Sequence, residues 1–63
     1  MFRSTITFMR GGRTPQDVIA EHELPSSSKL SDGRAAVAIA LEEARAVPFP
    51  EGVKQVNLVV WEV

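Results

Sequence analysis

The sequence contains no cysteine, no tyrosine and only one histidine, and these absences remove several kinds of site at once. Without cysteine, the chain forms no disulfide and offers no thiolate to a metal ion. A lone histidine, His22, does not by itself hold a structural zinc ion, which takes four ligands. We therefore expect a fold held by packing and hydrogen bonds, with no cofactor and no metal.

Long apolar runs and an excess of charge of one sign are also missing. The longest uninterrupted apolar run is 35–41, which is too short to span a bilayer. Polar residues interrupt 1–12, where a signal peptide needs an apolar stretch. The net charge of −1 lacks the basic excess of a nucleic-acid-binding protein, although Arg3, Arg10 and Arg13 make the N-terminal part locally basic. We expect a cytoplasmic protein with no membrane partner.

The chain is short for a fold without covalent or metal cross-links. A domain of 63 residues buries only about 60% of the surface that its unfolded chain exposes. The composition, 44% hydrophobic and 24% charged, is nevertheless that of a globular protein. We therefore expect one domain over residues 1–63 that associates as a homodimer, because association supplies the missing burial.

Strand patterns are present near both ends of the sequence. Residues 2–10 alternate apolar and polar side chains, with Phe2, Ile6 and Phe8 on one face. Residues 53–63 are apolar on both faces near the end, with Val56, Leu58 and Val60 on one and Val59, Trp61 and Val63 on the other. The second pattern is typical of a strand that is covered on both sides.

A first helix is expected directly after the Gly11-Gly12 pair. Thr14 suits an N-cap, Pro15 suits the first helical position, and Asp17 places a carboxylate near the positive end of the helix. We expect this helix to run from Thr14 to about Leu24, where the following proline ends it.

A second helix is expected from a cap at Ser31 or Asp32 to about Val47. Residues 36–41 also alternate small and large side chains, which is a strand pattern. The alanines and the following 42–45 segment favour the helix, since alanine is the best helix former.

The predicted fold is therefore α+β, in the order β-α-α-β, with two strands in one sheet packed against two helices. Whether the strands pair parallel or antiparallel stays open. Two helices cover only one face of such a sheet, so we expect the homodimer to extend or cover the other face. The expected oligomer interface consists of Ile39, Val59, Trp61 and Val63.

The inventory of reactive side chains argues against an enzyme. A catalytic triad needs a serine beside His22 and a carboxylate behind it, and nothing marks one of the serines as a nucleophile. Glu42 and Glu43 are sequence neighbours, which point about 100° apart on a helix and form no acid–base pair. We expect no catalytic residues.

The segment from Arg10 to Thr14 is the most suggestive short stretch. It joins a strand to an expected helix N-terminus, where glycines let the backbone approach an anion and arginines add positive charge. The candidate phosphate or nucleotide site consists of Arg10, Gly11, Gly12, Arg13 and Thr14. Its spacing matches neither the dinucleotide-binding nor the P-loop pattern, and a tight turn explains the same residues.

The first strand and the two helices after it resemble the ribbon-helix-helix regulators in layout, over residues 2 to about 47. In that family, paired strands of a dimer enter the DNA major groove. The resemblance implies that Arg3, Thr5 and Thr7 contact DNA bases. The chain departs from the layout by continuing into a second strong strand.

These observations leave three hypotheses in order of preference. The first is a small non-enzymatic binding protein that acts through a macromolecular interface, of the accessory or inhibitor kind found in bacteria and phages. Its expected partners are a second copy of the chain and another protein, with nucleic acid less favoured. The second is a dimeric DNA-binding regulator, and the third is a phosphate-binding module.

Overall fold

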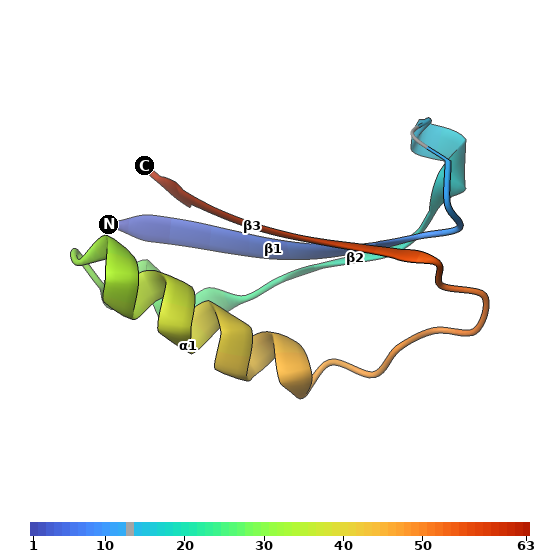
Figure 1. The fold of residues 1–63 in the computed structure, drawn as a ribbon. Coiled ribbons are helices and arrows are strands. Elements are labelled where there is room, and N and C mark those ends of the chain that lie inside the picture. The colour runs from blue at the N-terminus through green and yellow to red at the C-terminus, as the bar shows by residue number, and fades with distance from the viewer. Residues whose placement is uncertain (13) are drawn as a thin grey trace.

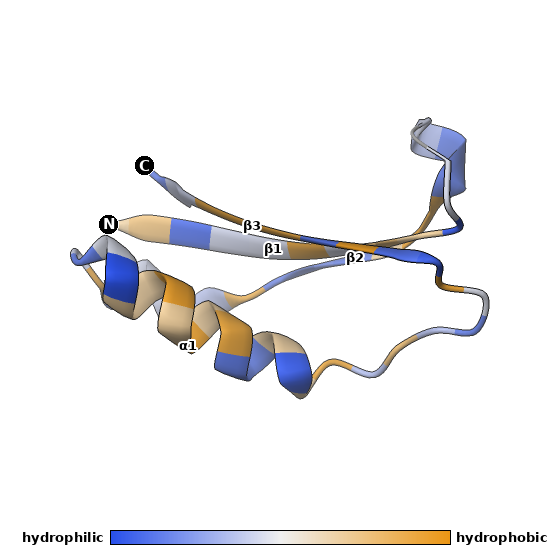
Figure 2. Ribbon diagram, viewed as in Figure 1, coloured by the Kyte–Doolittle hydropathy of each residue, from blue (hydrophilic) through white to orange (hydrophobic). Residues whose placement is uncertain are grey.

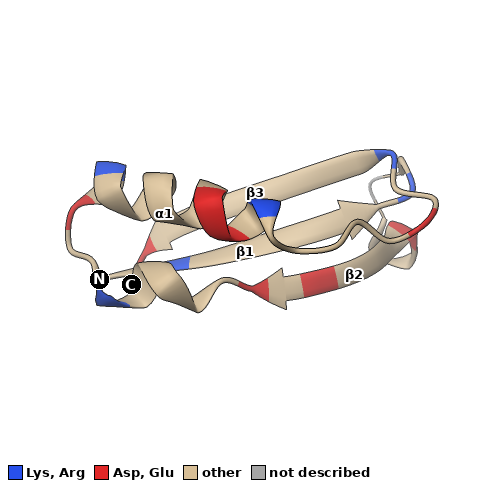
Figure 3. Cartoon of the chain, turned by 90° about the horizontal axis from the view of Figure 1, so that it is seen from below, with Lys and Arg blue, Asp and Glu red and all other residues tan. Residues whose placement is uncertain are grey.

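A computed structural model describes residues 1–12 and 14–63. Within these residues, three antiparallel strands form one sheet in the order β2-β1-β3, and one α-helix packs on it. Figure 1 shows α1 below the sheet, and Figure 3 shows β1 in the middle of the three strands. The predicted β-α-α-β fold, with two strands and two helices, is therefore wrong.

The strand β1 (Phe2–Met9) forms because its side chains alternate in polarity, as the sequence predicts. Its even-numbered residues Ser4, Ile6 and Phe8 are buried toward the helix layer. Since β1 is the middle strand, both of its edges are hydrogen-bonded, to β2 on one side and to β3 on the other. The strands that the sequence placed at the two ends of the chain are thus antiparallel neighbours.

The expected first helix is replaced by a single 3₁₀ turn, η1 (Pro15–Asp17), followed by the strand β2 (Val18–Glu23). Gly11 adopts a φ of 118°, which lets the chain reverse after β1 and return beside it. The helix prediction failed because the capping residues satisfy only the short turn, whereas pairing with β1 determines the segment after it.

The helix α1 (Gly33–Arg45) confirms the second helix, and residues 36–41 are helical rather than extended. The Asp32 side chain accepts a hydrogen bond from the Arg34 N–H and begins it. Ala36 and Ala40 are fully buried, so the helix approaches the sheet closely through its smallest side chains. A second 3₁₀ turn, η2 (Pro25–Lys29), lies between β2 and α1 and packs beside the helix.

The strand β3 (Gln55–Glu62) follows the proline-containing loop after α1 and pairs with β1 over its whole length. The core between the layers contains Ile6, Phe8, Leu24 and Ala40. Phe49 of the loop closes one end of this core with an edge-to-face contact to Phe8, at 5.0 Å between ring centroids. All of these core contacts lie on one side of the sheet.

Candidate functional site

The fold leaves uncovered the face of the sheet that points away from α1. In Figure 1, α1 and η2 lie on one side of the sheet, and η1 rises beyond one end of the other side. We call this second side the open face. On the open face, the odd-numbered residues of β1 have neighbours on the adjacent strands. The β3 neighbours of Arg3, Thr5 and Thr7 are Trp61, Val59 and Asn57. The β2 neighbours of Thr5 and Thr7 are Glu23 and Glu21.

Arg3 connects all three strands on the open face. Its Nη2 atom donates to Glu23 Oε2 of β2 at 2.7 Å, and its guanidinium carbon lies 6.0 Å from the centroid of the Trp61 ring of β3. The side chains of Arg3 and Glu23 are about half exposed, so water screens their attraction. The ion pair therefore fixes the position of the Arg3 guanidinium but adds little to the stability of the fold. The guanidinium is thereby held between a carboxylate and an aromatic ring.

Further along the same face, Thr7 Oγ1 donates to Glu21 Oε2 at 3.0 Å. Asn57 Nδ2 lies 3.3 Å from the Met9 sulfur, to which it donates a weak hydrogen bond. Val59 stands beside these groups with 48% of its surface exposed. The open face therefore combines an apolar strip on β3, ordered polar groups on β1 and two carboxylates on β2, where Figure 3 shows the acidic residues in red.

The residues of the predicted DNA contact, Arg3, Thr5 and Thr7, do share this face, as their alternation indicates. The ribbon-helix-helix layout behind that prediction is wrong, because β1 already has a strand on each edge and β2 replaces the first helix. Glu23 and Glu21 contact Arg3 and Thr7 directly. These carboxylates disfavour a phosphate backbone on this face.

Thr14, the last residue of the candidate phosphate site, already binds an anionic group of the chain itself, the Asp17 carboxylate. The Thr14 hydroxyl and N–H both donate to Asp17 Oδ2, at 2.7 and 3.3 Å. Arg10 Nη1 donates weakly to the Gln16 carbonyl at 3.4 Å. Arg13, which the sequence assigns to the same candidate phosphate site, lies outside the described residues.

The carboxylate at this turn stays ionised. The Thr14 hydroxyl, the Thr14 N–H and the nearby charge of Arg10 hold the pKa of Asp17 below its ordinary value of 3.8. A Cβ atom on Gly12 would lie 1.8 Å from Asp17 Oδ2, so the carboxylate occupies the space that this glycine leaves free. A phosphate at this turn would have to displace the carboxylate.

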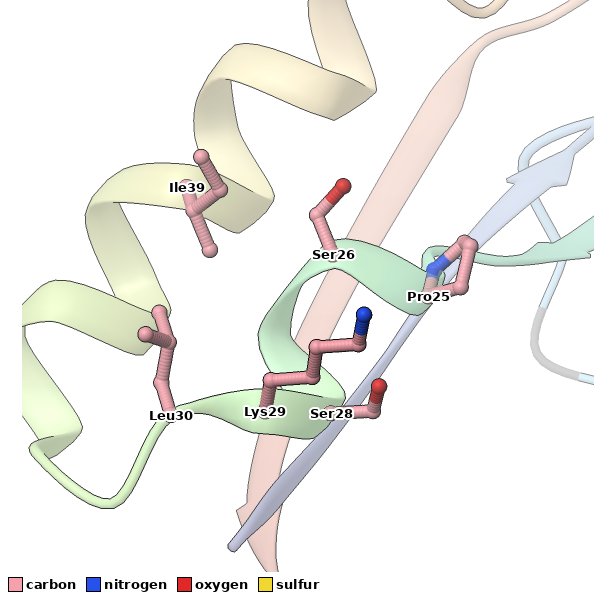
Figure 4. A pocket seen from close by; sticks show the side chains of 6 residues that line it. All are labelled: Pro25, Ser26, Ser28, Lys29, Leu30 and Ile39. Carbon is pink, nitrogen blue, oxygen red and sulfur yellow. The ribbon is translucent and has the colours of Figure 1, made fainter.

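The predicted oligomer interface is divided between two layers of the structure. Val59 and Trp61 lie on the open face, and Val63 follows β3 with 75% of its surface exposed. Ile39 lies on α1, in the other layer, where Figure 4 shows it beside Leu30 and the η2 turn at a shallow hollow. One flat contact does not cover all four residues.

Sequence reasoning missed two features of the surface. Glu21 and Glu23 were assigned to a helix, although their alternation with Ala20 and His22 is a period-two signal. The second feature is a pair of shallow apolar hollows between α1 and β3, which are lined by Phe2, Val37, Leu41, Phe49, Val56, Leu58 and Val60, among others. Figure 2 shows apolar residues recurring along both of these elements.

Comparison of the chain with protein-family models, curated proteins and solved structures returned no match. Within residues 1–12 and 14–63, no three histidine, aspartate or glutamate side chains gather into a possible metal site. Over the same residues, no helix is long and apolar enough to cross a membrane.

Proposed function

We propose that this chain is a non-enzymatic binding protein whose open face docks onto another protein. The arrangement of Glu23, Arg3 and Trp61 across the three strands is the observation that supports this proposal. Tryptophan and arginine are the residue types that contribute most to the binding energy of protein interfaces. Here both are partly exposed, and Arg3 is held in place by its neighbours before any partner arrives.

The charges on the open face indicate the chemistry of the partner. Arg3 is balanced by Glu23, whereas among the residues that the structure describes Glu21 receives a neutral donor, the Thr7 hydroxyl, and no cation. A complementary surface therefore has an apolar side chain opposite Val59 and Trp61, with a lysine or arginine beside it for Glu21. The proposal includes the accessory or inhibitor class and the cytoplasmic location expected from the sequence.

Affinity capture with matched variants tests the proposal. Wild-type protein, Trp61→Ala and Ile39→Ala are immobilised after circular dichroism has confirmed that all three are folded. Trp61 and Ile39 are equally exposed, at 39% and 37%, but lie in opposite layers. We expect one protein to be retained by wild type and Ile39→Ala, with at least about tenfold weaker binding to Trp61→Ala once it is purified.

Two results contradict the proposal. If the purified partner binds Trp61→Ala as tightly as it binds wild type, the open face does not form the contact. Binding of generic duplex DNA that falls steeply with salt and depends on Arg3 would instead favour the DNA-binding hypothesis. Fractionation of cells that express the protein checks the cytoplasmic location.

A further inference from the structure

The two edges of the sheet are protected to very different degrees. The β2 edge is short, carries Glu21 and Glu23, and has an irregular register opposite Phe8 and Met9. Charges, short length and bulges are the devices by which proteins keep an edge strand from pairing with another chain. The β3 edge has eight residues, and between Gln55 and Trp61 it contains neither a charge nor a proline.

The hydrogen-bond alternation shows which groups of β3 point outward. The Val63 N–H donates to the Met1 carbonyl at 2.9 Å, so the odd-numbered residues of the strand bond to β1. The N–H and C=O groups of Val56, Leu58 and Val60 consequently point to the outer edge. This edge is therefore a row of free donors and acceptors for another strand.

Charges at the two ends of this strand are complementary to each other. Lys54 stands directly before β3 and Glu62 is its last residue; both are exposed, and within the described part of the chain neither forms an ion pair. We propose that a second copy of this chain pairs antiparallel with the β3 edge, in the register that places Leu58 opposite Leu58 of that copy. In this register Val56 faces Val60 of the other copy. Each Lys54 lies at the same end of the seam as the Glu62 of the other copy, and its own N–H donates to the Met9 carbonyl of β1 rather than across the seam.

The helix layer supplies a second reason for this occupant. Val37 and Leu41 lie on the side of α1 that borders the two apolar hollows over β3, with 44% and 48% of their surface exposed. The two-fold axis of an antiparallel strand pair is perpendicular to the sheet, so both helices lie on one face of the combined sheet. Val37 and Leu41 of one copy then face those of the other above the seam, which covers apolar surface that one chain leaves exposed.

The resulting dimer has one six-stranded sheet whose two open faces are continuous with each other. The dimer does not depend on the function proposed above, because strand pairing uses the edge of β3 and leaves Arg3 and Glu23 of both copies accessible. Loss of partner binding in Trp61→Ala and loss of dimerisation in the variants below are therefore separate results.

Sedimentation of charge-reversed variants tests the pairing. Lys54→Glu and Glu62→Lys each bring like charges to both ends of the seam. We expect wild type to be a dimer at micromolar concentration and each single variant to have a dissociation constant raised about tenfold. The double variant restores opposite charges and should return to within about threefold of wild type. A monomeric wild type, or a double variant as weak as the singles, overturns the proposal.

Hydrogen exchange supplies an internal control that requires no substitution. In the dimer, the amides of Val56, Leu58 and Val60 donate across the seam, so their exchange should slow as the protein concentration rises. The amides of Asn57 and Val59 already bond to β1 and should change much less. Equal concentration dependence, or none, in the two sets also overturns the proposal.

Discussion

Arg3 Nη2 and Glu23 Oε2 lie 2.7 Å apart on neighbouring strands, and this contact joins the middle of the sheet to its β2 edge on the open face. Both side chains are about half exposed, so the pair keeps most of its contact with water. We expect a double-mutant cycle with Arg3→Ala and Glu23→Ala to give a coupling of about 0.2–1 kcal/mol in urea unfolding. The coupling should shrink as salt is added, because exposed charges are screened. A cycle between Arg3 and Glu21, which are not in contact, should give none; equal coupling in both cycles would contradict the role of the contact.

Ser4 and Ser27 are both fully buried, and their hydroxyl oxygens lie 2.6 Å apart. Ser4→Ala or Ser27→Ala alone leaves one buried hydroxyl without this partner and should lower the free energy of unfolding by about 1–3 kcal/mol. The double variant removes both polar groups and should lose clearly less than the sum of the two. Urea titration measures these differences, with exposed Ser28→Ala expected within about 0.5 kcal/mol of wild type. Additive losses would show that the hydroxyls do not depend on each other.

Gly12→Ala should destabilise the hairpin between β1 and β2, because the new Cβ would lie 1.8 Å from Asp17 Oδ2. The expected loss is about 1–2 kcal/mol of unfolding free energy. In an Asp17→Ala background the obstacle is absent, so Gly12→Ala should then have a much smaller effect. Gly33→Ala is a control: its Cβ would make an ordinary contact with Phe2, 3.4 Å away, and should leave stability unchanged or raise it by about 0.5 kcal/mol. The same loss in both backgrounds would contradict the steric explanation.

The lowered pKa of Asp17 predicts a pH-dependent contribution to stability. The Thr14 hydroxyl, the Thr14 N–H and the charge of Arg10 favour the ionised carboxylate in the folded state. The contribution is therefore fully present above the unfolded pKa of 3.8 and is lost as the pH falls through the lower folded pKa. Thermal unfolding should show wild type more stable than Asp17→Asn at neutral pH, with the difference disappearing in strong acid.

Direct titration checks the cause of that shift. Carbon NMR of the Asp17 carboxyl should give a pKa below 3.8 in wild type and a higher value in Thr14→Val, which lacks the donating hydroxyl. An Asp17 pKa at or above 3.8 in the folded wild type would show that the hydrogen bonds do not stabilise the charge.

Local signals predicted three of the four main elements. Alternation identified β1 and β3, and a cap at Ser31 or Asp32 together with the helix propensity of the alanines identified α1. The same alternation placed Arg3 and Thr7 of the candidate site together on one face, and Val59 and Trp61 together on the corresponding face of the last strand. Successive side chains of a strand point to opposite faces of the sheet, so the face of each residue can be predicted without knowing the partner strand.

The segment 18–24 shows where local signals are insufficient. Thr14, Pro15 and Asp17 do begin a helical turn, but it ends after three residues because β1 offers a free edge beside it. That edge lies nine or more residues away in the sequence. Helix propensities describe single residues and their near neighbours, so they do not include hydrogen bonds to such a distant strand. Because the segment was predicted as a helix, Glu21 and Glu23 were not predicted to lie on the same sheet face as Arg3 and Thr7.

The amino-acid sequence itself determined the two faces of each terminal strand, the helix of the middle segment, and the absence of disulfides. The order β2-β1-β3, the open face shared by Arg3, Glu23 and Trp61, and the unprotected edge of β3 were settled only when the chain packed in three dimensions. The physical reason is that side-chain alternation and helix capping act between near neighbours, whereas strand pairing joins residues as distant as Phe2 and Glu62.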